Sequence, residues 1–174
     1  LAIASLIAVS LTALAVGGRL LALARRTREL PELLLGSAVL LNGLGFLAFS
    51  LAVQTDCVPA SARIAALTAG SLGIAAGAGC VTVFTWWVFR PYGLAPLLLT
   101  GSIILMLGAG FVNLLVIPEP AWVRTASPLY RVGLAGRTLA YGWAAFESFR
   151  YYRMLLRRTR LGLAQASVAT RMRL

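Results

Sequence analysis

Residues 94–117 read LAPLLLTGSIILMLGAGFVNLLVI, a run of 24 residues that contains no charged side chain. A helix needs about 20 mostly apolar residues to cross roughly 30 Å of membrane hydrocarbon. Backbone groups inside a bilayer have no water to bond to, so they must pair within a helix or a closed barrel. The run is therefore long enough and apolar enough to predict a membrane-spanning helix.

Three more apolar runs precede this one and one follows it. The breaks between the runs carry prolines and charged residues. Water can satisfy freed backbone groups at such breaks. The predicted spans are residues 1–24, 33–54, 64–88, 94–117 and 132–156, of which the last is the least uniformly apolar. We predict an all-α polytopic transmembrane helix bundle over residues 1–160. Residues 161–174 are expected to form an interfacial segment or the start of a further helix.

The composition excludes several classes of protein. Hydrophobic residues make up 60% of the chain, against about 45–50% in soluble domains, and the mean hydropathy is +0.86. A soluble enzyme is therefore excluded. There is no histidine to ligate haem, zinc or chlorophyll. Every basic residue is an arginine, so no lysine can form a Schiff base with retinal.

The arginines also predict the orientation in the membrane. Ten of them fall at one set of span ends and four at the other, and cytoplasmic loops carry the excess of positive charge. The larger group is Arg19, Arg25, Arg26, Arg28, Arg90, Arg150, Arg153, Arg157, Arg158 and Arg160. This asymmetry places the N-terminus outside. The net charge of +11 then reflects topology and attraction to anionic lipid headgroups rather than binding to nucleic acid.

One four-residue sequence occurs twice. Arg-Arg-Thr-Arg closes the first span at residues 25–28 and the fifth at residues 157–160. One interpretation is coincidence, because arginines gather at inner span ends. The other is a duplicated three-helix unit with residues 94–117 as its linker, as in transporters with internal repeats. The duplication would require two more spans after residue 160.

The segment RELPELLLG at residues 28–36, together with GLA at residues 162–164, resembles bacterial seven-helix membrane proteins. Their 3+1+3 plan is shared by microbial rhodopsins and SWEET-type sugar transporters. The resemblance covers helix ends and no catalytic motif. It implies a multi-pass protein of the bacterial inner (cytoplasmic) membrane. The chain lacks the retinal lysine and the proline-glutamine turn of SWEET-type transporters, so no functional residue carries over.

Small residues recur at four-residue spacing in the third span, at Ala69, Gly73 and Gly77. Such rows let helix backbones approach closely in lipid, which predicts a packing seam. The alternative is a groove that seats a flat apolar molecule such as a carotenoid, a quinone or a lipid tail. Asn42 lies near the middle of the second span, where an asparagine bonds to a neighbouring helix or contacts a substrate.

Glu147 is a carboxylate inside a predicted span, and such residues are functional candidates by default. Arg150 lies three residues further on the same helical face, which predicts an ion pair near the inner interface. A proton or ion site is the alternative, although no second carboxylate falls within a predicted span. Tyr141 and Trp143 lie deeper and are candidates for contact with a partner helix, a pigment or a ligand.

No metal-ligand spacing, phosphate loop or nucleophile–base set is present in the sequence, so an enzyme is not expected. Three functions remain. The first is an accessory subunit that packs against other subunits of a membrane complex of respiratory or photosynthetic type. The second is a small-solute transporter or channel of 3+1+3 type. The third is a membrane sensor that signals through the arginine-rich segment 150–160.

Overall fold

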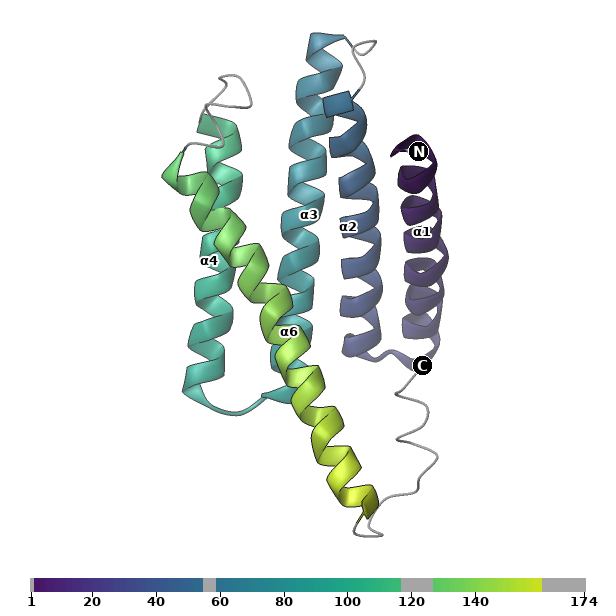
Figure 1. Cartoon of the computed structure of the whole chain (residues 1–174), viewed down its shortest axis with the longest axis vertical. Helices are drawn as coiled ribbons and strands as arrows, with labels where there is room; N and C mark the ends of the chain where they lie inside the picture. The colour runs from purple at the N-terminus through teal and green to yellow at the C-terminus, as the bar shows by residue number, and fades with distance from the viewer. Residues whose placement is uncertain (1, 55–58, 117–126, 161–174) are drawn as a thin grey trace.

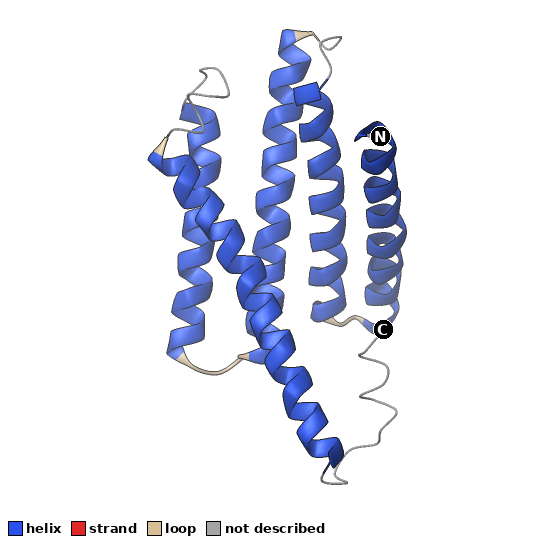
Figure 2. Cartoon of the chain, in the orientation of Figure 1, coloured by secondary structure: helices blue, strands red, loops and turns tan. Residues whose placement is uncertain are grey.

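The computed structural model describes residues 2–54, 59–116 and 127–160. Its helices are α1 (Ala2–Thr27), α2 (Leu30–Gln54), α3 (Ala60–Phe89), α4 (Leu94–Val116) and α6 (Pro128–Arg160). No strand occurs among the described residues (Figure 2). The prediction of an all-α bundle is therefore confirmed. The interfacial segment or further helix expected at residues 161–174 lies outside the described residues.

Four of the helices, α1 to α4, are long and apolar enough to cross a membrane. The chain is thus an integral membrane protein with several transmembrane helices. Helix α6 is longer, at 33 residues, but charged side chains such as Arg137 and Glu147 lower its hydropathy. The fifth span, expected at residues 132–156, therefore stays a prediction.

The helices run alternately up and down, so that successive connections lie at opposite ends of the bundle (Figure 1). Helix α1 packs against α2, and α2 packs against α3. Helices α4 and α6 pack against each other and against α3. Helix α6 crosses the bundle obliquely, and its C-terminal part continues past the ends of the other helices (Figure 1).

A two-residue connection joins α1 to α2. The amide of Arg28 donates to the Ala24 carbonyl at 2.8 Å, and Arg28 adopts a left-handed φ of 58°, which ends the helix. The Thr27 hydroxyl donates to the Glu32 carboxylate across the turn. This short connection makes α1 and α2 an antiparallel hairpin.

Glycines make the closest helix contacts in the bundle. A Cβ added to Gly70 of α3 would lie 2.7 Å from the carbonyl oxygen of Gly45 in α2, and one added to Gly110 of α4 would lie 2.7 Å from the Cα of Gly133 in α6. Such distances leave room for hydrogen only. The backbones therefore approach closely, as small residues permit in lipid.

The predicted seam on the third span requires one correction. Gly73 and Gly77 do face α2, with added Cβ atoms meeting the Leu41 carbonyl and the Asn42 side chain. Ala69 is exposed, and Gly70 takes its place in the seam. The residues of α3 that contact α2 are therefore spaced by three and then four positions. Helices that cross at a small angle pack with this alternation rather than with steps of four alone.

A small core forms where α3, α4 and α6 meet. Ala78, Ile103, Leu107 and Ala140 are buried there, and Trp143 packs against them. Trp143 was expected to contact a partner, a pigment or a ligand. Here it is half-buried and packs against the chain's own core, and the expected contact stays a prediction.

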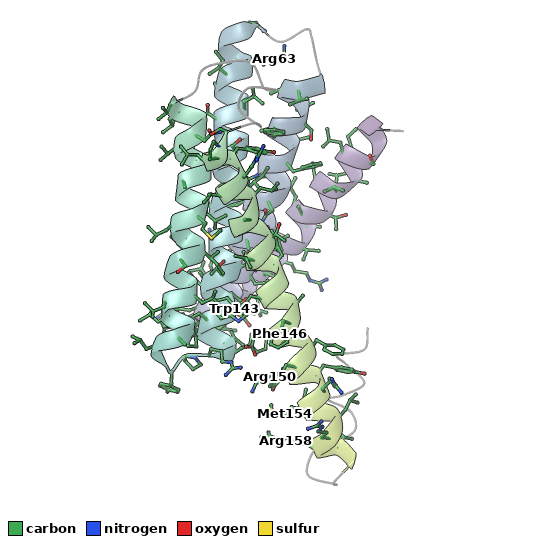
Figure 3. All side chains as sticks on the ribbon, turned by 60° about the vertical axis from the view of Figure 1, so that its left-hand side comes forward. Arg63, Trp143, Phe146, Arg150, Met154 and Arg158 are labelled. Carbon is green, nitrogen blue, oxygen red and sulfur yellow. The ribbon has the colours of Figure 1, made fainter. Side chains whose placement is uncertain are left out.

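The two ends of the bundle differ in charge. Arg63 lies at the end where α3 begins, whereas Arg150 and Arg158 lie on the part of α6 that projects from the opposite end (Figure 3). The connection from α1 to α2, with Arg28, is at this second end (Figure 1). The arginine-rich group of the sequence is thus gathered at one end, and the positive-inside rule predicts that this end lies inside.

Candidate functional site

An open groove of about 730 Å³ lies between α1 and α6, with α2 and α3 as its floor. It exists because α1 makes its substantial contact with α2 alone among the described helices. Most of the wall is apolar, and includes Val9 and Ala13 of α1 and Phe46 of α2. The hydroxyl of Thr12 also lines the groove, but it donates to the Ala8 carbonyl at 2.8 Å within its own helix.

One polar pair lies on the wall of this groove. The Tyr141 hydroxyl donates to Asn42 Oδ1 at 2.7 Å, and Asn42 Nδ2 donates to the Ala38 carbonyl at 2.8 Å. The pair joins α6 to α2 across 99 positions of sequence. Gly77 of α3 leaves room for it, because an added Cβ would collide with the Asn42 amide.

The sequence singled out Asn42 and Tyr141 separately, and the structure brings them together. Asn42 was expected to bond to a neighbouring helix or to a substrate; here its oxygen is bonded to another helix. The second N–H of the Asn42 amide and the lone pairs of the tyrosine oxygen retain bonding capacity. The groove is therefore suited to a mostly apolar molecule with few polar atoms.

A second polar site joins the C-terminal end of α3 to α6. Glu147 is 6% exposed, and Arg90 Nε donates to its Oε1 at 2.9 Å. Arg150 Nη1 lies 3.8 Å from Oε2 of the same carboxylate. The Arg90 amide donates to the Trp86 carbonyl at 2.9 Å, which keeps the residue on the last turn of α3.

The sequence predicted Arg150 as the partner of Glu147 and missed Arg90. Arg150 is present but more distant, and Arg90 makes the charge-assisted hydrogen bond. Arg90 lies 57 positions from Glu147, so no helical spacing could have found it. Its one signal was membership of the inner arginine group. The carboxylate is thus paired within the chain, and the ion-site interpretation stays a prediction.

Metal binding has no support in the described part of the chain. No group of three or more cysteine, aspartate or glutamate side chains comes together there. The hollow of about 280 Å³ beside Glu147 is lined by Arg90 and Arg150, whose positive charges disfavour a cation.

The side of α4 that faces away from the other described helices carries a regular stripe of apolar residues. Its members follow a 4-and-3 spacing and are all exposed: Leu94, Leu98, Gly101, Leu105, Gly108, Val112 and Leu115. Leu105 is 77% exposed, and nothing lies within 4 Å of a Cβ added at Gly101 or Gly108. We refer to these seven residues as the outer α4 face.

The chain matches no protein-family profile, no curated protein and no solved structure. The seven-helix resemblance therefore stays a prediction. Function has to be inferred from the groove, the charged pair and the outer α4 face.

Proposed function

We propose that this chain is a non-enzymatic subunit of a larger membrane complex, and that it packs through the outer α4 face against a transmembrane helix of another subunit. The support is one observation. Gly101 and Gly108 lie open, one heptad apart, in a stripe of exposed leucine and valine. A heptad stripe with small residues suits close contact with a second helix at a small crossing angle.

Comparison with the other helical glycines supports a contact at this stripe. Of the 15 described helical glycines, ten would place an added Cβ against a neighbouring helix, and five would not. Glycine costs a helix about 1 kcal/mol relative to alanine, and close contact is what offsets that cost here. Gly101 and Gly108 are the two open glycines, among those described, that share one face of one helix.

The chemistry of the partner follows from the stripe. The outer α4 face has no charged residue and only apolar side chains around its two glycines. It fits an apolar transmembrane helix whose larger side chains lie over Gly101 and Gly108.

Purification from the native membrane tests this proposal. The tagged chain should be isolated in mild detergent and weighed by native mass spectrometry, with the G101L/G108L double variant beside it. We expect the wild type in a fixed ratio with at least one other subunit, and a loss of that subunit by about tenfold or more in the variant. Leucine at both positions fills the space that the partner helix needs.

The matched control is Gly142→Leu, which also adds a leucine at an open, exposed glycine but on α6. It should keep the partner subunit. If the wild type runs alone or only with copies of itself, the accessory role is wrong. Equal retention of the partner by G101L/G108L and Gly142→Leu would show that the interface lies elsewhere.

A small-solute transporter is the second candidate, and the buried Glu147 favours it. Carboxylates at membrane depth serve proton relays in such proteins. Proton flux tests this candidate. The purified chain is placed in vesicles that contain a pH-sensitive dye, and a potassium diffusion potential drives proton entry. Flux that falls about tenfold in Glu147→Gln, but not in Glu29→Gln at the exposed α1–α2 turn, would support transport. Absence of flux in the wild type would argue against this candidate.

A further inference from the structure

We propose that the groove between α1 and α6 holds the acyl chain of one anionic phospholipid, and that Arg19 and Arg26 of α1 bind its phosphate. This site is independent of the outer α4 face and of the proposed function. It is built from one continuous face of α1 that changes from apolar to basic along its length.

Two hollows share that face. The groove is lined by Val9, Thr12 and Val16 of α1. A second hollow of about 590 Å³ is lined by Val16 again and then by Arg19 and Arg26. The shared Val16 makes the two continuous. Residues 12, 16, 19, 23 and 26 follow 4-and-3 spacing, so they stand on one side of the helix.

The length of this face fits one membrane leaflet. Arg19 lies ten residues from Val9, which is about 15 Å along a helix. The hydrocarbon core is about 30 Å thick, so each leaflet supplies about half of that. A phosphate held at Arg19 therefore allows an acyl chain to reach the far end of the groove at Val9. Arg26 lies about 10 Å further toward the inner end of α1. Long arginine side chains can extend along the helix to the headgroup level, so Arg19 and Arg26 can both reach the phosphate.

Charge favours an anionic lipid over a neutral one. Neither Arg19 nor Arg26 forms an ion pair with a carboxylate in the described part of the chain, and both are exposed. The guanidinium fork pairs with phosphate oxygens in a bidentate manner. Two such groups at the mouth of an apolar groove match an amphiphile with a negative head.

The size of the groove fits a single lipid chain. The groove holds about 730 Å³, within the range of about 300–1,000 Å³ of small-molecule sites. A single lipid chain fits this volume without moving α1.

Native mass spectrometry of the purified full chain tests the headgroup. The probes are phosphatidylglycerol and phosphatidylcholine with identical acyl chains, added after stepwise delipidation. We expect one phosphatidylglycerol to bind at least about tenfold tighter than phosphatidylcholine. The R19Q/R26Q variant should abolish that preference, whereas R25Q/R28Q, which removes two arginines from the same inner end but outside the hollow, should keep it.

A second pair of variants tests the groove. Val9→Trp fills the groove from α1, and Leu11→Trp adds the same side chain to an exposed position of α1 that does not line it. Val9→Trp should lower phosphatidylglycerol binding about tenfold, and Leu11→Trp should not. Circular dichroism of each variant checks that the helices remain.

Three outcomes would overturn the proposal: equal binding of the two lipids by the wild type, an unchanged preference in R19Q/R26Q, or full binding by Val9→Trp. Displacement of the lipid by inorganic phosphate alone would show an anion site without a chain in the groove, which also contradicts it. A second copy or another subunit crosslinked to position 9 would identify the groove as a protein interface instead.

Discussion

The two faces of α4 have similar composition and opposite surroundings. On one face, Ile103, Leu107 and Gly110 are packed against α6 and α3. On the other, nothing in the described chain lies within 4 Å of a Cβ added at Gly101 or Gly108, and Leu105 between them is 77% exposed. A helix that is apolar on all sides gives no amphipathic signal for its buried face. The comparison shows that, within a membrane helix, glycine contact identifies a packed face better than hydropathy does.

The largest change in the free energy of unfolding should come from adding a side chain on the packed face of α4. In Gly110→Leu, the new Cβ would lie 2.7 Å from the Cα of Gly133, where only backbone could move. We expect a loss of about 3 kcal/mol in the free energy of unfolding, from overpacking at a backbone contact. Unfolding in mixed detergent micelles, followed by circular dichroism, measures it.

The matched change on the open face is Gly101→Leu. In the isolated chain it should not destabilise the fold, and it should raise the free energy of unfolding by up to about 1 kcal/mol, because the new side chain enters open space and the helix cost of glycine is removed. Equal destabilisation by Gly101→Leu and Gly110→Leu would remove the distinction between the two faces of α4.

A smaller effect is expected where α6 meets the end of α3. Arg90→Gln removes the 2.9 Å contact to the buried Glu147 and leaves Arg150 at 3.8 Å. We expect a loss of about 2 kcal/mol, below the value for a fully buried pair because the Arg90 side chain is 37% exposed. Arg150→Gln, at an exposed and more distant partner, should cost less than about 1 kcal/mol. The same unfolding measurement ranks the two, and the reverse order would refute the assignment of Arg90 as the main partner.

The smallest effect concerns the polar pair in the groove. A double-mutant cycle of Asn42→Ala and Tyr141→Phe should give a coupling of about 0.6–1 kcal/mol, as for other hydrogen bonds between membrane helices. Unfolding of the two single variants and the double variant supplies the cycle. A coupling near zero would mean that Asn42 and Tyr141 do not bond in the bilayer.

Hydropathy predicted the presence of the helices, because lipid forces long apolar runs to be helical. The bounds moved outward where charged residues continue a helix: α1 extends to Thr27, and α6 extends from Pro128 to Arg160. These are the ends where water or headgroups solvate side chains without breaking the helix. The apolar pattern alone could not show that continuation.

The sequence found candidate residues but not their partners. Asn42, Tyr141 and Glu147 stood out as polar groups in apolar runs. Their contacts to one another and to Arg90 depend on how α2, α3 and α6 cross. Crossing is set by small-residue seams distant in sequence, and the seam of α3 uses Gly70 in place of Ala69, which lies about 100° away around the helix.

The attachment of α1 has a mechanical consequence. Among the described residues, one substantial seam and a two-residue turn hold this helix to the other helices, so force applied at the N-terminus loads one contact line rather than several. Pulled along the membrane normal, α1 should detach first and on its own, with α2 to α6 still folded. A link between α1 and α6 would give α1 a second attachment, and α1 should then detach only at a higher force.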